Sequence, residues 1–411
     1  MRLLHVSDWH LGRTTYNCSR VPDHQQVIGE ILKLAKEVRP HLICHTGDLF
    51  DRLRPSYTDL ALGIEALQEL ATVAPVIVVC GNHDSPALFR LFGALLGEDA
   101  PIRFIDRARP PEQGGIYQFP GEGDEVVRLA PLPFVHANRV VEYFEDSATW
   151  MAKYADRIHL FQDALGRGLT ADYDPSRHVL LFAAHLYVSG AVFSNSERPI
   201  HVSDTYSSRP ERLPQVSYAA FGHIHRPQAL PGSIVGRYAG SPIALDFGEE
   251  GEDKVAVIVE AEPGRPPEVT THPLSGGRPL RRVRGTLDDL EQLAPSIGRA
   301  LCAVTVLTQE PTSSVADRVR DLLPEAVLLQ VVEDCAARRV TVLQSSDAAT
   351  NAEPSFGELF RSYLAEQGTR GARADRVMRT FEGFLRAVEQ EEVPEFPEIE
   401  QLEAPLVDIE R

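Results

Sequence analysis

Residues 76–84 read VIVVCGNHD, and this stretch decides the fold class. The run Val76–Cys80 is short, apolar and rich in β-branched side chains, which is typical of a buried strand. The tetrapeptide Gly-Asn-His-Asp at 81–84 follows at once, and polar residues there have little structural purpose. In open α/β sheets, functional sites form at the carboxyl ends of strands. The stretch therefore predicts an α/β sheet that carries functional side chains where a strand ends.

The same pattern recurs along the first part of the chain. Short apolar runs alternate with the helical stretches Gln25–Val38, Tyr57–Thr72 and Pro86–Leu96, an order that favours an α/β domain with parallel strand pairing. Further predicted strands are each followed by polar residues, so the clusters are expected to converge in one crevice. These strands and clusters are Leu3–Ser7 with Asp8 and His10, Leu42–Thr46 with Asp48 and Asp51, His178–Ala183 with His185, and Tyr218–Phe221 with His223 and His225.

The spacing within the clusters suits a metal site. Asp8 and His10 are two residues apart, so in extended backbone both side chains point the same way, and His223 and His225 repeat that spacing. Carboxylate and amide oxygens mixed with imidazole suit Mn²⁺, Fe²⁺ or Zn²⁺. No cysteine takes part, which argues against a structural zinc site.

Each motif alone also has an ordinary structural explanation. An isolated Asp-x-His is more often a capped strand end, a Gly-Asp is usually a turn, and Gly-His-x-His can be two histidines at a turn. Five such motifs in chain order favour catalysis over coincidence. By contrast, His5, His45 and His178 lie within predicted strands and are expected to be structural.

The motif series at 8–225 resembles the calcineurin-like metallophosphoesterases. Within that family, the phrases HVSDWHLG (5–12), HTGDLFD (45–51), VVCGNHDSP (78–86) and FGHIHRPQ (221–228) are similar to the nuclease subunits of bacterial DNA-repair complexes. The resemblance implies an α/β/β/α sandwich of two mixed sheets flanked by helices. It also implies a small α+β capping domain and a C-terminal helix pair.

The resemblance further implies a dinuclear centre, with two Mn²⁺ expected and Mg, Fe or Zn left open. Asp48 would bridge the ions and His83 would act on the leaving group. Asp84 would orient His83, and Asp51 would be an orienting residue where relatives often have a histidine. The other implied ligands are Asp8, His10 and His225 for the first metal, and Asn82, His185 and His223 for the second.

The expected domain organisation follows changes in composition along the chain. Within the first domain, the Pro- and Gly-rich residues 106–125 are expected to be a surface loop or hairpin insertion, and further strands at Ser233–Ala239 and Lys254–Glu260 are expected to finish a second sheet. Pro- and Gly-rich residues at 263–279 separate a nuclease domain from a strand–helix–strand–helix–strand unit. After a polar linker come two amphipathic helices and an acidic tail. The predicted limits are 1–270 for the nuclease domain, 275–344 for the capping, DNA-binding domain, 345–354 for the linker, 355–390 for the helix pair and 391–411 for the tail.

Composition limits the function classes. The 411 residues carry a formal net charge of −18, which argues against a stand-alone DNA-coating protein but allows a nuclease whose metal ions supply positive charge. The 5 cysteines include no Cys-x-x-Cys and are expected to be reduced thiols. Cys44 and Cys80 lie inside apolar strand-like runs and are expected to be small core side chains. No apolar run of membrane-spanning length and no secretion signal are seen, so a cytoplasmic, nucleoid-associated protein without membrane contact is expected.

The resemblance also implies partners. The helix at Pro86–Leu96 is apolar around more than one face and is expected to form a homodimer together with the helix near 57–72. The helix pair at 355–390 is expected to dock on the coiled coil of an ATPase, giving a heterotetramer; packing on the chain's own core is the alternative. The implied activity is 3′→5′ double-strand exonuclease and single-strand or hairpin endonuclease on DNA. A free-standing phosphatase or nucleotidase and a non-catalytic scaffold remain alternatives.

Overall fold

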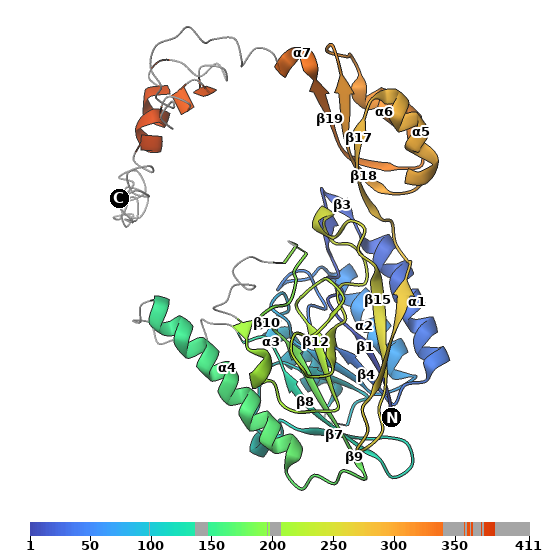
Figure 1. Ribbon diagram of the computed structural model, residues 1–411, viewed down its shortest axis with the longest axis vertical. Helices are drawn as coiled ribbons and strands as arrows, with labels where there is room; N and C mark the ends of the chain where they lie inside the picture. Colours follow the sequence, from blue (N-terminus) through green and yellow to red (C-terminus); the bar gives the residue numbers. More distant parts are fainter. Residues whose placement is uncertain are drawn as a thin grey trace, which may run out of the picture. The chain divides into compact units, whose positions relative to one another are not determined.

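The computed structural model describes residues 1–97, 99–135, 147–194, 196–197, 207–339, 357, 360–361, 363–364, 371 and 374–382. Two compact units divide the chain, Met1–Arg339 and Val340–Arg411. Figure 1 shows the first unit as two layered sheets with helices outside them, followed by a smaller strand-and-helix region. No helix in the described ranges combines the length and the apolar character needed to cross a bilayer.

The first sheet is mixed and contains the N-terminal strand. Its strands β1, β4, β5 and β6 run parallel, and β15 and β16 continue the sheet in antiparallel pairing on the other side of β1. In spatial order they are β16 (Glu268–Leu274), β15 (Lys254–Glu260), β1 (Arg2–Val6), β4 (Leu42–His45), β5 (Val76–Val79) and β6 (Ile102–Ile105).

The second sheet is also mixed. Strands β14, β12, β9 and β8 are parallel, and β13 and β7 are antiparallel edge strands. Their spatial order is β13 (Gln228–Ala229), β14 (Gly236–Tyr238), β12 (Tyr218–Gly222), β9 (His178–His185), β8 (Val126–Leu132) and β7 (Tyr117–Pro120).

Helices cover the outer faces of both sheets, as expected for an α/β/β/α sandwich. The first sheet packs against α1 (Val21–Val38), α2 (Tyr57–Ala71) and α3 (Pro86–Leu96), and the second against α4 (Ser147–Thr170) (Figure 1). A capping box at Ser56 starts α2, and the Ser85 side chain caps α3 just before Pro86.

A buried apolar layer lies between the two sheets. Cys44 and Ile77 from the first sheet pack in the same cluster as Leu181 from the second, and all three are at most 1% exposed. The expected role of Cys44 as a small core side chain is therefore confirmed. Because both sheets are anchored in this layer, their strand ends are held at fixed positions relative to one another.

Two features differ from the sequence-based expectation, and one agrees with it. Strand β15 joins the first sheet, not the second, because it pairs with β1 along Arg2–His5. The surface loop or hairpin insertion expected at 106–125 holds a short helix, η1 (Pro111–Gln113), and β7, which forms a hairpin with β8 and extends the second sheet. Strand β8 and helix α4 were not anticipated.

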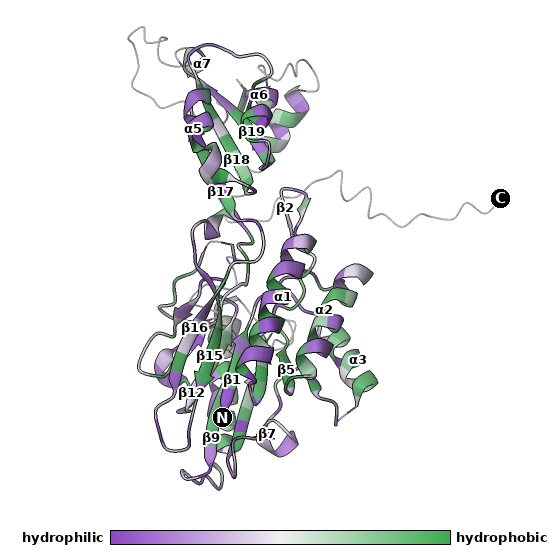
Figure 2. Cartoon of the chain, turned by 90° about the vertical axis from the view of Figure 1, so that its right-hand side faces the viewer, coloured by the Kyte–Doolittle hydropathy of each residue, from purple (hydrophilic) through white to green (hydrophobic). Residues whose placement is uncertain are grey.

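The remaining part of the first unit is a β-α-β-α-β region, as predicted. Its three strands are parallel, and their buried side chains face two helices (Figure 2). A capping box between Thr286 and Asp289 fixes the start of the first helix. The elements are β17 (Leu280–Gly285), α5 (Leu287–Ile297), β18 (Leu301–Thr308), α6 (Val315–Leu322), β19 (Val327–Cys335) and α7 (Ala336–Arg339).

Several short elements complete the first unit. They are β2 (Thr14–Thr15), β3 (Cys18–Ser19), β10 (Tyr187–Val188), β11 (Ser207–Ser208), η5 (Pro210–Arg212) and η6 (Phe247–Glu249).

The second unit is described only in part. Residues 374–382 are helical, and the Phe381 ring stacks on Phe360 with 4.0 Å between ring centroids. Arg361 lies 3.8 Å from Glu382 across the same contact. The helix pair at 355–390 stays a prediction, and the predicted linker at 345–354 and tail at 391–411 lie outside the described residues.

Candidate metal centre

Strand ends from both sheets meet at one place. The backbone N–H of His223, after β12 of the second sheet, donates to the Asp8 carboxylate, after β1 of the first, at 3.1 and 3.2 Å. The Thr46 carbonyl, after β4, lies 2.8 Å from His185 Nδ1 at the end of β9. The predicted convergence of the polar clusters is therefore what the structure contains.

Backbone conformation at this edge is unusual. Asp8, His10, Asp48 and His223 have positive φ angles of 50°, 48°, 51° and 96°. Side-chain-bearing residues adopt such angles at an energetic cost, and this strain concentrates at functional sites. Gly47 approaches the site so closely that a Cβ there would lie 2.1 Å from His185 Nδ1. Local backbone strain at these positions therefore accompanies the placement of their side chains in the site.

One half of the site brings the Asp8–His10 pair together with His225. His10 Nε2 and His225 Nε2 lie 3.1 Å apart, and Asp8 supplies a carboxylate oxygen within 4.8 Å of both rings' ligand atoms. All three side chains are at most 4% exposed.

The other half is built around an amide oxygen. Asn82 Oδ1 lies 2.9 Å from His185 Nε2 and 2.8 Å from His223 Nδ1. The two ring nitrogens are 3.3 Å apart, and Phe134 stacks on the His223 ring with 5.8 Å between centroids. The three polar side chains are again at most 3% exposed.

Asp48 lies between the halves. Its Oδ2 is 3.5 Å from His10 Nε2 and 3.4 Å from His185 Nε2, while its Oδ1 accepts a 2.7 Å hydrogen bond from the His83 backbone N–H. One carboxylate oxygen thus faces a ligand nitrogen of each half.

The donor set fits divalent cations. Two imidazole nitrogens face each other at 3.1 Å in one half of the site and at 3.3 Å in the other. When both nitrogens of a pair carry lone pairs they repel each other, and a bound cation would remove that repulsion. Buried carboxylates, an amide oxygen and imidazoles are the ligands that Mn²⁺, Fe²⁺ or Zn²⁺ accept. Overlapping ligand groups, Asp8–His10–His225 and Asp8–Asp48–His185, lie on either side of the centre.

Electrostatics in the centre reflect burial and mutual attraction. Burial alone disfavours charge on His185, but the neighbouring Asp48 carboxylate raises the pKa of that histidine to about 9. Burial also raises the pKa of Asp8, to about 6. Burial on its own would raise the pKa of Asp48. The attraction of His185 and other nearby histidines outweighs burial and holds the pKa of the Asp48 carboxyl well below its usual range.

His83 is more exposed than the other site histidines. Its Nδ1 lies 2.8 Å from the Asp51 carbonyl oxygen, and its ring packs edge-on against His10 with 4.6 Å between centroids. Since a carbonyl only accepts, His83 Nδ1 carries a hydrogen and Nε2 is the nitrogen left to act at the site. His83, His10 and Asp48 each offer a possible metal-ligand atom, and these three atoms lie within 4.8 Å of one another.

Asp84 has partners other than the expected one, whereas Asp51 contacts two site histidines. The Asp84 carboxylate accepts backbone hydrogen bonds from Leu49, Phe50 and Gly81 at 3.2, 2.9 and 2.9 Å, so it fixes two strand-end loops instead of orienting the His83 ring. The Asp51 carboxylate lies 3.3 Å from His10 Nδ1, while the Asp51 main chain holds His83.

Some supporting residues carried no recognisable signal. Glu249, in η6, places Oε1 3.1 Å from His225 Nδ1, and Ser196 Oγ lies 2.7 Å from the same nitrogen. Thr46 acts through its main chain. An acidic residue in the Glu- and Gly-rich stretch 248–253 cannot be distinguished from a solvated one without the tertiary contacts.

Two parts of the chain match models of known protein families. Residues 1–227, more than half of the chain, match the family model described as calcineurin-like phosphoesterase. The chain belongs to the calcineurin-like phosphoesterase family. Residues 277–368 of this phosphoesterase also match a model described as type 5 capsule protein repressor C-terminal domain.

The phosphoesterase is similar to curated proteins over most of its length. It is 32% identical over 287 residues to the SbcD subunit of the nuclease SbcCD from Bacillus subtilis, covering 68% of this chain and 71% of that protein. It is 27% identical over 410 residues to the SbcD subunit of the nuclease SbcCD from Escherichia coli, covering 93% of this chain and 97% of that one.

Solved structures were also compared with this phosphoesterase. A dimetal phosphatase from Danio rerio matches with a TM-score of 0.39 and 12% identity, covering 66% of this chain and 98% of that one. A Thermus thermophilus protein matches with a TM-score of 0.36 and 13% identity, covering 67% and 99%.

Proposed function

We propose that this chain is a metal-dependent nuclease subunit of the SbcD type, which hydrolyses DNA phosphodiesters at a dinuclear centre. Its activities would be 3′→5′ exonuclease on double strands and endonuclease on single strands and hairpins. The observation that carries the proposal is the placement of Asp48 between two groups of ligands, in a chain similar over 93% of its length to an SbcD subunit of the nuclease SbcCD.

The ligand assignment is part of the proposal. The first ion would be held by Asp8, His10, Asp48 and His225, and the second by Asp48, Asn82, His185 and His223. When bound, the two cations would supply positive charge to offset the phosphodiester oxygens and would make a water molecule more acidic and thus a better nucleophile. We propose two Mn²⁺; the ligand chemistry also accepts Fe or Zn, and Mg is the remaining alternative.

The protein's own contribution beyond the ligands centres on His83. Its Nδ1–H donates to the Asp51 carbonyl, which fixes the ring and leaves Nε2 free at the half-exposed face. A proton on Nε2 would be transferred to the departing sugar oxygen, a general-acid effect of typically 10²–10⁴-fold. Asp84 supports this arrangement by holding the loops that carry Asp48 and His83.

The expected partners extend the proposal. Exposed apolar residues on α3 fit a homodimer, because Leu91, Leu95 and Leu96 are 52%, 75% and 42% exposed. Figure 2 shows most of the α3 ribbon in the colour of hydrophobic residues. The helix pair at 355–390 would dock on the coiled coil of an SbcC-type ATPase, giving a heterotetramer on DNA. We place the assembly in the cytoplasm with the nucleoid, in keeping with free cysteines throughout.

The experiment is cleavage of end-labelled double-stranded DNA by the full chain, alone and with the ATPase partner, in Mn²⁺, Mg²⁺ or EDTA. Bis-p-nitrophenyl phosphate is assayed in parallel. Asp48→Asn is the test variant, and Asp156→Asn, at an exposed position of α4, is the matched control. DNA cutting that requires Mn²⁺ and disappears only in Asp48→Asn is expected.

The alternative function predicts a different pattern. A free-standing phosphoesterase would turn over mononucleotides or the small ester far faster than DNA, with and without the partner. That result would replace the nuclease proposal while keeping the metal centre. Absence of both metal and turnover in the purified chain would favour a non-catalytic scaffold.

A further inference from the structure

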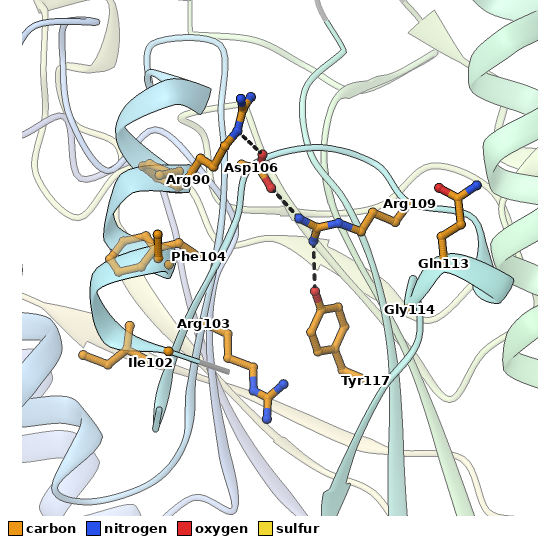
Figure 3. A pocket seen from close by; sticks show the side chains of 13 residues that line it. Arg90, Ile102, Arg103, Phe104, Asp106, Arg109, Gln113, Gly114 and Tyr117 are labelled. Atoms are coloured by element: carbon orange, nitrogen blue, oxygen red, sulfur yellow. Dashed lines mark hydrogen bonds and ion pairs between the residues drawn. The ribbon is translucent and has the colours of Figure 1, made fainter. Parts of the chain in front are cut away.

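A cavity of about 600 Å³ lies outside the metal centre, between α3, β6 and β7. Figure 3 shows its walls: Arg90 comes from α3, Arg103 and Phe104 come from β6, and Arg109 and Tyr117 come from the chain that leads into and forms β7. These five residues and Asp106 define what is called the arginine cavity below.

Two of the guanidinium groups are fixed by one buried carboxylate. Arg90 Nε lies 3.3 Å from Asp106 Oδ2, and Arg109 donates to Asp106 Oδ1 at 2.8 Å from the opposite wall (Figure 3). The Asp106 side chain is 3% exposed. A guanidinium held in this way loses less conformational freedom when it binds a further anion, and its remaining N–H groups keep their fork geometry.

The third guanidinium has no carboxylate partner in the described part of the chain. Arg103 lies over the Tyr117 ring at 5.7 Å from the centroid, and the Tyr117 hydroxyl accepts from Arg109 at 3.4 Å. Three guanidinium groups against the single carboxylate of Asp106 leave two positive charges in the cavity. In a chain with a net charge of −18, that is a local excess of positive charge.

The cavity lies beside the catalytic edge of the first sheet. Strands β5 and β6 are parallel neighbours, so Asn82, just after β5, and Asp106, just after β6, lie at the same sheet edge. Helix α3, which carries Arg90, starts two residues after Asp84. A strand of nucleic acid held at the metal centre could therefore continue to the cavity along this edge.

We infer that the arginine cavity binds the phosphate group of a nucleotide. Planar guanidinium groups match the oxygens of phosphate in bidentate geometry, which a halide cannot use. The two positive charges left in the cavity suit a phosphate monoester dianion, or successive phosphates of a strand, better than a single carboxylate. The phosphate would belong either to a free mononucleotide or to a nucleic-acid strand, and the second source rests on the nuclease function proposed above.

The test is direct binding by the full chain in EDTA, so that nothing is cleaved. Adenosine monophosphate is titrated by calorimetry, and a fluorescent single-stranded oligonucleotide is titrated by anisotropy. The variants are Arg103→Gln, which leaves the Asp106 pairs intact, and Arg109→Gln. Arg107→Gln is the matched control, because Arg107 is exposed on the same loop and does not line the cavity.

Loss of one guanidinium–phosphate contact is expected to weaken binding about tenfold, with the control within about twofold of wild type. An effect on the monophosphate identifies a free nucleotide as ligand. An effect confined to the oligonucleotide identifies a strand, and the slope of log K against log salt should then fall by about 0.7 per arginine lost. Equal binding by Arg103→Gln, Arg109→Gln and the control, or no binding of either probe, overturns the inference.

Failure of this inference is separable from failure of the proposed function. Mn²⁺-dependent DNA cleavage by the wild-type chain is measured independently. If DNA is cleaved but both cavity variants bind as wild type, only the cavity assignment is lost. If the cavity variants lose binding but DNA is not cleaved, the phosphate site stands and the nuclease function is lost.

Discussion

Glu249 Oε1 lies 3.1 Å from His225 Nδ1, and the Glu249 side chain is completely buried. Lys254 Nζ donates to the other carboxylate oxygen at 2.6 Å, and Ser241 Oγ does so at 2.8 Å. Burial opposes ionisation, but Lys254 outweighs it and holds the pKa of Glu249 far below its usual range. The carboxylate therefore accepts the Nδ1–H of His225 and turns its Nε2 lone pair toward the metal centre.

We predict that Glu249→Gln lowers metal affinity about 10–100-fold, because the amide orients His225 less well and leaves Lys254 with Glu252 alone, 3.2 Å away, as its counter-charge. Titration of the metal-free chain with Mn²⁺, followed by calorimetry or electron paramagnetic resonance, measures this. Glu260→Gln, at an exposed strand end, is the control. Unchanged affinity in Glu249→Gln would show that the buried network serves stability alone.

His83→Ala separates binding from chemistry. We expect turnover of DNA to fall about 10²–10⁴-fold while Mn²⁺ stoichiometry stays at the wild-type value, since His83 is assigned to the leaving group and not to the metals. The exposed His272 provides the control substitution His272→Ala. Loss of metal from His83→Ala would instead make this residue a ligand, which its distance to His10 and Asp48 also permits.

Asp84→Ala tests the loop-fixing role seen in the structure. Three backbone N–H groups would lose their acceptor, and leaving buried donors unpaired costs about 1–3 kcal/mol each. A loss of about 3 kcal/mol or more in unfolding free energy is expected in denaturant titrations of the metal-free chain. A variant as stable as wild type would contradict the assignment.

Asp23 provides a pH-dependent contribution to stability. It is buried in α1 and pairs with Arg20 Nε at 2.7 Å and with Arg278 NH2 at 2.8 Å, which ties the chain before β17 to α1. Burial opposes its ionisation, but the hydrogen bonds from Arg278 outweigh burial and lower the pKa of Asp23. The ionised Asp23 therefore raises the free energy of unfolding above pH ~4, the pH range in which an ordinary aspartate ionises.

The direction of this pH dependence follows from the coupling between proton binding and folding. Because the folded state binds the proton more weakly than the unfolded state, the contribution is complete at neutral pH and is lost as pH falls through the lowered pKa. The difference in unfolding free energy between wild type and Asp23→Asn should therefore shrink from pH 7 to pH 3. A difference that stays constant over this range would refute the ion-pair explanation.

Leu95→Asp tests the proposed homodimer surface on α3. Leu95 is 75% exposed, so a charge there should leave the fold intact while preventing apolar contact between two copies. Light scattering after size exclusion should show a monomer for the variant and a dimer for wild type. Leu160→Asp, at a 66% exposed position of α4, is the control.

Sequence patterns located most of the elements that carry the site. The predicted strands at Leu3–Ser7, Leu42–Thr46 and Val76–Cys80 correspond to β1, β4 and β5, because apolar runs flanked by polar turns report local backbone preference. Strand β8 was missed since it follows a Pro- and Gly-rich stretch and contains Pro131. The sheet to which β15 belongs was misassigned because strand pairing is a long-range choice.

The ligand types could be read from local motifs, but their supports could not. Asp8, Asp48 and Asn82 stand directly after strands, and the strand-end rule places them correctly. The partners of Asp84 are backbone N–H groups up to 35 residues away, and the partner of His225 is Glu249, whose neighbours in the sequence are also acidic. Motif spacing contains no record of such contacts.

Periodicity and the order of residues along the chain are enough to predict the α/β layout, the residue types of the candidate metal centre and the strand ends that carry them. The family resemblance implied the position of Asp48 between the two halves of the centre. The tertiary contacts alone revealed that Glu249 orients His225 and that arginines from α3, β6 and the chain before β7 share one cavity. Those relationships depend on distances between segments that are far apart in the sequence. The packing of the two sheets sets these distances, and the local residue pattern does not encode them.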